Sequence, residues 1–248
     1  MSDRPPGRLR AVLFDWDGTL LDSYRADVHA YLGMFAALGV RWGERELRRH
    51  YSPDWHRIYR AAHIPPQRWD EADRLWARFY RQQRPRLLPG ARRVVHWVAR
   101  RYRVALVTSG HRARVERQLR AFGWERVFAV RICCEDAAQR KPHPEPLQQA
   151  LHRLDVAAAE CIYVGDAPED VQMARRAGVC AVGVLGPFPT HRRLRAARPD
   201  VLLRSLRELP ALLRDRFRQD GTPRQDCGRT AAGRAWRTAS RRGSGSGV

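Results

Sequence analysis

Near its start the chain reads Ala11-Val-Leu-Phe-Asp-Trp-Asp-Gly-Thr-Leu-Leu-Asp22. Four apolar residues bounded by charge and glycine predict a buried strand that ends at the edge of a sheet. Asp15 and Asp17 follow at once, and residues two apart in an extended chain point the same way. Two carboxylates in one small volume repel unless they hold a proton or share a cation. A nucleophile and a general acid/base around a divalent metal ion would use such a pair, while an Asp-rich turn is the structural alternative.

The composition excludes several classes of protein. The 248 residues are 44% hydrophobic, enough for one substantial domain and a smaller one. No apolar run is long enough to cross a bilayer, and residues 1–10 are polar, so neither a membrane span nor a signal peptide is expected. The five cysteines form no C-x-x-C pair, which argues against a zinc site or a disulfide framework. We therefore expect a soluble, cytoplasmic protein with reduced thiols.

The formal net charge of +21 raises the question of nucleic-acid binding. Lys141 is the only lysine among 47 lysines and arginines, and the chain has no asparagine. This pattern is typical of a gene that avoids A/T-rich codons, and the arginines are scattered rather than gathered with aromatic residues. We favour a compositional origin of the charge. The alternative is a protein that binds nucleic acid or another acidic partner through its basic surface and tail.

From residue 91 onward, helical and strand patterns alternate, which is typical of a parallel sheet covered by helices on both faces. Strands are predicted at 11–14, 104–107, 127–132, 161–164, 179–184 and 201–203. Helices are predicted at 92–101, 112–122, 144–154, 168–177, 192–197 and 206–217.

Residues 23–88 have a different pattern, rich in Trp, Tyr and Arg and without strand-like alternation. Helices are predicted at 24–38, with Ser23 as its cap and Gly39 at its end, and at 44–50, 54–62 and 67–83. We therefore predict a core at 9–22 and 89–217, a helical insert at 23–88, and a disordered basic tail at 218–248.

Polar groups follow four of the predicted strands, at the edge where parallel sheets bind ligands. They are Asp15, Asp17, Thr108, Ser109, Gly110, Lys141, Asp166 and Asp170. Asp166 and Asp170 are four residues apart and can face one side of the first turn of a helix. Carboxylate oxygens with a substrate phosphate are ligands that Mg²⁺ prefers. Taken singly, this pair could merely favour a helix N-terminus.

The other groups suit a phosphate. The hydroxyl of Thr108 and the backbone N–H groups of Ser109 and Gly110 can hold phosphate oxygens at a helix N-terminus, although such a turn is more often a simple helix cap. The ammonium of Lys141 can offset charge on a transferring phosphoryl group. Its retention in an arginine-rich chain favours a function, because a guanidinium is not equivalent to a compact ammonium. The four strand ends together predict a site for phosphoryl transfer.

These residues resemble the haloacid dehalogenase (HAD) superfamily of hydrolases, in its phosphoglycolate phosphatase-like group with a helical cap. The matching motifs are Phe14-Asp-Trp-Asp-Gly-Thr-Leu20, Val107-Thr-Ser-Gly110, Lys141-Pro-His-Pro144 and Val164-Gly-Asp-Ala-Pro-Glu-Asp170. The resemblance spans about 9–215. It implies an α/β fold: a Rossmann-like three-layer core with a parallel sheet, plus an inserted α-helical cap domain.

The resemblance also implies roles. Asp15 would attack phosphorus, and Asp17 would protonate the leaving alcohol and then deprotonate water. Thr108 and Lys141 would hold the phosphoryl group. Mg²⁺ would bind Asp15, the backbone carbonyl of Asp17 and Asp166, with Asp170 either a ligand or in contact with one.

The implied function is Mg²⁺-dependent hydrolysis of a small phosphomonoester, phosphoglycolate-like or a sugar phosphate. Dehalogenases typically lack the second aspartate of the first motif, so Asp17 argues against C–halogen cleavage. Phosphonatases use a lysine of the cap, and residues 23–88 contain none. Neither a membrane nor nucleic acid is expected as a partner. Cap residues that could meet an anionic substrate, or form a solvated helix face, are Arg41, Arg45, Arg48, Arg49 and His50.

Overall fold

The computed structural model describes residues 8–216, and a six-stranded parallel sheet forms their centre. The strand order is β5-β4-β1-β6-β7-β8. The strands are β1 (Ala11–Phe14), β4 (Arg103–Val107), β5 (Val130–Ile132), β6 (Cys161–Gly165), β7 (Cys180–Val184) and β8 (Val201–Leu203). The predicted α/β class with a parallel sheet is confirmed.

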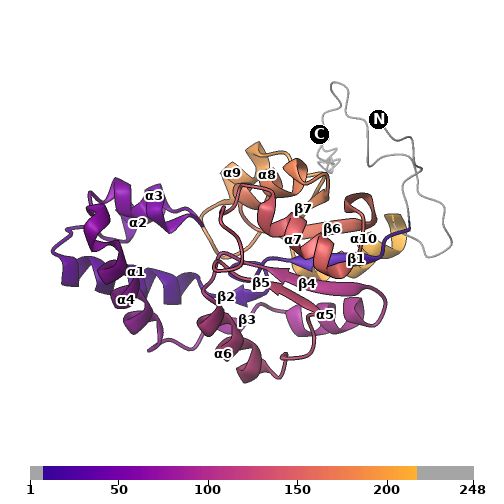
Figure 1. Ribbon diagram of the computed structural model, residues 1–248, viewed down its shortest axis with the longest axis horizontal. Helices are drawn as coiled ribbons and strands as arrows, with labels where there is room; N and C mark the ends of the chain where they lie inside the picture. The colour runs from indigo at the N-terminus through magenta and orange to yellow at the C-terminus, as the bar shows by residue number, and fades with distance from the viewer. Residues whose placement is uncertain (1–7, 217–248) are drawn as a thin grey trace, which may run out of the picture.

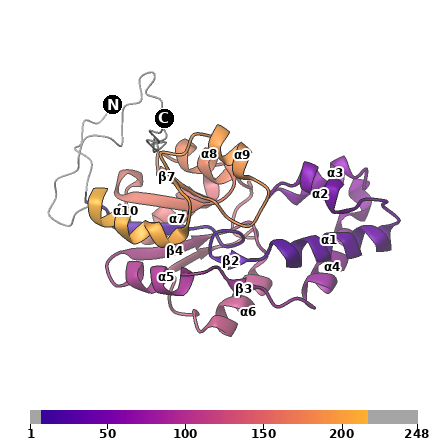
Figure 2. The same ribbon diagram turned by 180° about the vertical axis from the view of Figure 1, so that it is seen from behind.

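Helices cover both faces of the sheet (Figures 1 and 2). Val12 and Phe14 of β1 pack into one hydrophobic cluster, and Ala11 and Leu13 into the other, as expected of a strand buried on both sides. The first face carries α5 (Ala91–Ala99), α6 (Arg112–Phe122) and α10 (Leu209–Arg216). The second carries α7 (Glu145–Leu154), α8 (Pro168–Arg176) and α9 (His191–Ala196).

The helical insert, residues 23–88, forms a separate group at one end of the molecule (Figure 1). It holds α1 (Tyr24–Leu38), α2 (Glu44–His50), α3 (Trp55–Ala61) and α4 (Trp69–Tyr80). Its helices bury their own cluster, which includes Met34, Phe35, Ile58 and Tyr59. Because this cluster is distinct from the two clusters on the sheet, the helical insert has a core of its own.

Two expectations for this region are wrong. A short antiparallel ribbon, β2 (Leu21–Asp22) with β3 (Arg86–Leu87), joins the helical insert to the core, where no strand was predicted. Two-residue strands are too short to show alternation. The side chain of Ser23 does not cap α1; its hydroxyl is buried without a partner among the described residues, and its backbone carbonyl accepts the N–H of Asp27 at 2.8 Å.

Other predicted strands and helices differ from the observed ones by a few residues at their ends. The strand expected at 127–132 begins only at Val130, because Val127 and Phe128 pack on the core from the turn before it. The helix expected at 206–217 divides into a 3₁₀ turn (Leu206–Glu208) and α10. The predicted tail at 218–248 lies outside the described residues. Within 8–216, each helix is too short or too polar to traverse a lipid bilayer.

The helical insert is bonded to the core on two sides of the sheet edge. On one side, Arg193 donates to the backbone carbonyl of Tyr51 at 2.8 Å, and the Tyr51 ring stacks on Phe188 with centroids 4.8 Å apart. On the other, Gln118 of α6 donates to the hydroxyl of Tyr80 at 3.3 Å. The helical insert therefore covers the carboxyl edge of the sheet, and a cavity lies between them.

Candidate active site

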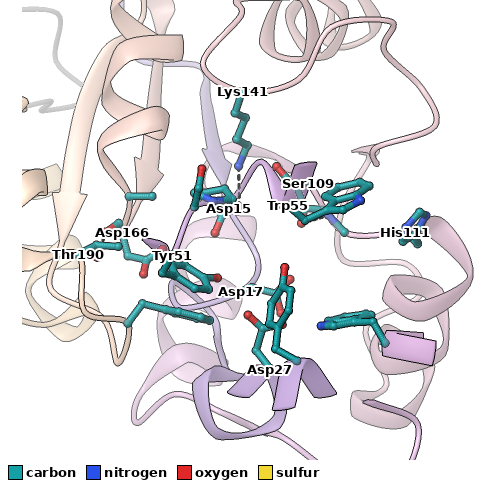
Figure 3. A pocket seen from close by; sticks show the side chains of 18 of the residues that line it. Asp15, Asp17, Asp27, Tyr51, Trp55, Ser109, His111, Lys141, Asp166 and Thr190 are labelled. Atoms are coloured by element: carbon teal, nitrogen blue, oxygen red, sulfur yellow. Dashed lines mark hydrogen bonds and ion pairs between the residues drawn. The ribbon is translucent and has the colours of Figure 1, made fainter. Parts of the chain in front are cut away.

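All eight residues predicted from the strand ends line this cavity. Figure 3 shows Asp15, Asp17, Ser109, Lys141 and Asp166 around it. Asp15 and Asp17 follow β1, Thr108 to Gly110 follow β4, and Asp166 follows β6. Helix α8 contributes Asp170, and Lys141 comes from the segment between β5 and α7. The structure thus brings the predicted residues together in one place.

Lys141 is the centre of the buried part of the site. Its ammonium donates to Asp15 Oδ1 at 2.6 Å, to Asp170 Oδ1 at 2.9 Å and to the hydroxyl of Tyr163 at 2.7 Å. Burial alone would lower the pKa of Lys141, yet the charges of Asp15 and Asp170 raise it above its usual value. The lysine therefore stays charged and holds two carboxylates in place.

Tyr163 is a site residue that the sequence analysis missed. Its hydroxyl accepts a hydrogen bond from Lys141 and lies 2.9 Å from the backbone oxygen of Val107, to which it donates. Tyr163 occupies a strand position that reads as ordinary core, since β6 is buried along its whole length. No signal in the sequence distinguishes a tyrosine with this role from one that only packs.

We expect Tyr163→Phe to lower the free energy of unfolding by about 1–3 kcal/mol, because a buried ammonium and a buried carbonyl each lose a partner. Urea unfolding followed by circular dichroism measures this. Tyr102→Phe is the matched control, since the hydroxyl of Tyr102 makes no hydrogen bond to a described residue and should shift stability little. Equal stabilities of the Tyr163 and Tyr102 variants would contradict the assignment.

Asp15, Asp166 and Asp170 form a group that could hold a metal ion. One carboxylate oxygen from each lies within 4.8 Å of the others, and all three residues are buried. Burial, together with the neighbouring carboxylates, raises the pKa of Asp15 to about 7 and that of Asp166 well above its usual value. Three carboxylates thus face a single ammonium, and a hard divalent cation such as Mg²⁺ fits both their oxygen atoms and their excess charge.

Gly18 lets the chain turn tightly beside this group. Its φ of +83° lies in the left-handed region, and a Cβ at this position would lie 2.3 Å from Asp166 Oδ2. A side chain here would therefore displace a carboxylate of the acidic group. Glycine is the residue that allows the backbone after Asp17 to approach it.

The side chain of Asp17 does not join the acidic group. Arg114 of α6 binds both its oxygens, with Nη1 2.9 Å from Oδ1 and Nη2 2.6 Å from Oδ2. Arg114 is itself buried and lies near the hydroxyl of Tyr80 of the helical insert, at 3.5 Å. Arg114 could not be singled out from the sequence, where it is one arginine among many. Only the fold shows that it orients Asp17.

The turn at Thr108, Ser109 and Gly110 matches the predicted phosphate-binding arrangement only in part. The hydroxyl of Thr108 accepts the backbone N–H of Gly110 at 3.0 Å, so that N–H is used within the turn rather than free for a phosphate. Helix α6 does begin just beyond, at Arg112, where the carboxylate of Glu135 accepts the backbone N–H at 3.0 Å. Thr108 and Ser109 remain as the polar groups of this turn at the cavity.

The basic residues of the helical insert lie elsewhere. None of its arginines or histidines is among the described residues that line the cavity. The candidates for an anionic substrate, Arg41, Arg45, Arg48, Arg49 and His50, are all exposed. They form the solvated face that was the alternative interpretation.

The helical insert instead contributes Asp27, which points into the cavity toward Asp17 (Figure 3). Its side chain is 9% exposed. Burial raises the pKa of Asp27 to about 7; the charge of Asp17 adds to the rise and Arg114 opposes it. Without a bound ligand, Asp27 therefore holds a proton in neutral solution for much of the time.

This pKa predicts a pH dependence of stability. The folded protein keeps a proton on Asp27 that the unfolded chain, with a pKa of 3.8, has lost. The contribution of Asp27 to the free energy of unfolding therefore falls as the pH rises from about 4 to 7, by at most ~1.4 kcal/mol per pH unit. Asp27→Asn should flatten this fall when chemical unfolding is measured across that range. Parallel pH profiles of the wild type and the variant would contradict the prediction.

The parallel α/β core places a lysine and carboxylates that could hold a hard cation where such sheets bind ligands. This arrangement suits an enzyme that acts on phosphorylated compounds. The chain belongs to the haloacid dehalogenase-like hydrolases, whose family model matches residues 12–184.

Similar proteins indicate the group within this family to which the chain belongs. A phosphoglycolate phosphatase from Cupriavidus necator is 36% identical over 218 residues, which cover 82% of this chain and 92% of the relative. The pyrophosphatase PpaX of Bacillus thuringiensis is 27% identical, covering 84% of this chain and 98% of its own length. The solved structure of CbbY from Rhodobacter sphaeroides in complex with phosphate has a TM-score of 0.70 at 28% identity, over 81% of this chain and 96% of that chain. The resemblance to the phosphoglycolate phosphatase-like group is confirmed, and the chain is a phosphatase enzyme.

Proposed function

We propose that the chain is a Mg²⁺-dependent phosphatase that hydrolyses a small phosphomonoester through a phosphoryl group carried on Asp15. The observation that carries this proposal is the carboxylate of Asp15. The side chain is 9% exposed, lies at the cavity, and is held by Lys141 at 2.6 Å. A carboxylate fixed in this way beside a permanent cation is suited to attack phosphorus and to form a covalent intermediate.

The proposal assigns a metal site and a cap. Asp15, Asp166 and Asp170 would hold Mg²⁺, with the backbone carbonyl of Asp17. When bound, the ion supplies positive charge for the phosphate oxygens and the buried carboxylates. Residues 23–88 would act as a cap over a core at 9–22 and 89–217, so that closure shields the reacting atoms from bulk solvent.

The chain's own residues would carry the two steps. In the first, a bond forms between phosphorus and an Asp15 oxygen and the ester bond breaks. Asp17, protonated on an oxygen that has released its contact with Arg114, gives that proton to the leaving oxygen. In the second, Asp17 takes a proton from water, the water oxygen attacks phosphorus, and the bond to Asp15 breaks. Lys141 and the hydroxyl of Thr108 would hold the phosphoryl oxygens. Arg114 would be a positioning residue, because it fixes the carboxylate of Asp17.

The proposed setting is the cytoplasm, where the thiols of Cys133, Cys134 and Cys161 stay reduced. The proposed partner is a small phosphate ester, not a membrane or nucleic acid. A protein repurposed for acidic partners has no need of a buried Asp15–Lys141 pair at the cavity, so we do not favour that alternative.

Phosphate release tests the proposed function directly. We expect release from a panel of p-nitrophenyl phosphate, phosphoglycolate and several sugar phosphates in Mg²⁺, and a loss of at least about 100-fold in EDTA that added Mg²⁺ restores. Unchanged release in EDTA would contradict the metal site. Salt-sensitive retention of DNA or RNA by a folded protein without turnover would favour the repurposed binding protein.

A further inference from the structure

The wall that the helical insert contributes to the cavity is mostly aromatic. Six rings of the helical insert line it: Tyr31, Tyr51, Trp55, Tyr59, Trp76 and Tyr80. The rings are packed against one another, with Trp76 stacked on Tyr80 at a centroid distance of 4.7 Å. Burial raises the pKa of Tyr31 and Tyr51 well above the usual value, so both remain phenols. In the proposed reaction, this wall faces the alcohol that leaves from the phosphate.

The same wall also carries two carboxylates. Asp27 and Asp73 line the cavity, and neither forms an ion pair with a described residue. Asp73 accepts a hydrogen bond from the hydroxyl of Tyr59 at 2.8 Å, which leaves its charge uncompensated. Among its described residues, this wall has two acids and no arginine, lysine or histidine. It therefore differs from most of the surface of a chain whose formal net charge is +21.

The basic side chains on the opposite side of the cavity already have partners. Arg114 binds both oxygens of Asp17, Lys141 lies between Asp15 and Asp170, and His111 lies 3.2 Å from a Glu135 oxygen. Three donors at the cavity have no acceptor among the described residues: the indole N–H groups of Trp55 and Trp76, and the Nε–H of Arg114, whose two Nη atoms bind Asp17. They suit a hydroxyl or ester oxygen. A leaving group with a carboxylate or a second phosphate would meet Asp27 and Asp73, and the nearest guanidinium, that of Arg114, is already paired with Asp17.

From these contacts we propose that the leaving alcohol carries a positive charge, so that the substrate is the phosphate monoester of an amino or quaternary ammonium alcohol. This inference rests on the proposed phosphatase function. Faces of tyrosine and tryptophan rings attract a cation through their quadrupole, and rings grouped around a cavity are a known means of holding quaternary ammonium groups. Arg114 already lies over Trp76 and Tyr80, and Arg140 lies over Trp55. The proposed cation would therefore contact the rings of Tyr31, Tyr51 and Tyr59. Asp27 and Asp73 would supply the neutralising charge, and a bound cation would favour the ionised form of Asp27.

Relative rates on matched esters test the proposal. With saturating Mg²⁺, we expect kcat/KM for phosphocholine and phosphoethanolamine to exceed that for glycerol phosphate by at least about tenfold, which corresponds to one well-placed charge contact. Phosphoglycolate, with its carboxylate, should be the poorest ester. A higher kcat/KM for glycerol phosphate or phosphoglycolate would overturn the proposal.

Variants assign the preference to the two carboxylates. The double change Asp27→Asn with Asp73→Asn should lower the ratio of kcat/KM for phosphocholine to that for glycerol phosphate by about tenfold or more. Asp70→Asn is the matched control, because Asp70 is exposed on the same helix as Asp73, and it should leave the ratio unchanged. An unchanged ratio in the double variant would contradict the role of these carboxylates.

Failure of this inference can be told apart from failure of the proposed function. Metal-dependent hydrolysis of p-nitrophenyl phosphate with a preference for anionic esters would overturn only the inference. No hydrolysis of any ester, p-nitrophenyl phosphate included, would overturn the function. Quenching of tryptophan fluorescence gives a readout without turnover, because Trp55 and Trp76 line the cavity: choline should bind more tightly than glycolate, and the reverse order would contradict the inference.

Discussion

Replacement of Asp15 by asparagine should lower the rate of phosphate release by about 10⁴-fold or more. An amide of nearly the same shape keeps the packing of the site but removes the nucleophilic oxygen. It also removes one of the three carboxylates that could hold a metal ion. Steady-state phosphate release in saturating Mg²⁺ measures the loss.

The Asp15 variant should remain folded. Lys141 keeps Asp170 and Tyr163 as partners, and one charge leaves a group of carboxylates that repel one another. We expect thermal unfolding, followed by circular dichroism, to occur at or above the temperature of the wild type. A folded variant with more than a tenth of wild-type turnover would remove Asp15 from the role of nucleophile.

Replacement of Asp17 by asparagine should lower kcat for an alkyl phosphate by about 10²–10⁴-fold, because the leaving alkoxide then receives no proton. With p-nitrophenyl phosphate, the rate of the first step should fall much less, because this leaving group departs without a proton. Rapid-quench measurement of p-nitrophenol release before the first turnover separates this step from the later hydrolysis.

Asp22→Asn is the matched control for the Asp17 variant. It makes the same change of charge at an exposed position of β2 and should leave both steps near wild type. Equal losses of the first step with alkyl and p-nitrophenyl esters in the Asp17 variant would show that Asp17 does not donate the proton. Arg114 would then be the side chain to examine, since it binds both Asp17 oxygens.

Much of the fold follows from local pattern. Helices 24–38, 44–50 and 112–122 have the predicted bounds, because apolar spacing and a final glycine or a change of composition mark their ends. The ribbon of β2 and β3 was missed because two residues have no period. Ser23 was assigned a cap that its conformation does not allow: at φ −103° and ψ −3° the residue is already helical rather than extended.

The site was predictable where chemistry follows directly after a strand, and unpredictable where it comes from packing. Asp15 and Asp166 each follow a buried strand, and strands of one parallel sheet end at the same edge. Arg114 and Tyr163 are different. Each has a residue type that is common at its position, and its partners lie 97 and 22 residues away in sequence. The aromatic and acidic wall has the same origin, because it exists only where α1, α3 and α4 meet over the sheet edge.

A covalent phosphoryl group on Asp15 is the central claim, and trapping it is the most direct test. The Asp17→Asn variant should accumulate it from p-nitrophenyl phosphate in Mg²⁺, because attack by Asp15 proceeds while the water of the second step has lost its base. After acid quenching and proteolysis, mass spectrometry should find one phosphoryl group on the peptide that contains Asp15, and none when Asp15 is also changed to asparagine. Release of p-nitrophenol with no phosphoryl group on that peptide, or with the group on another residue, would contradict the mechanism.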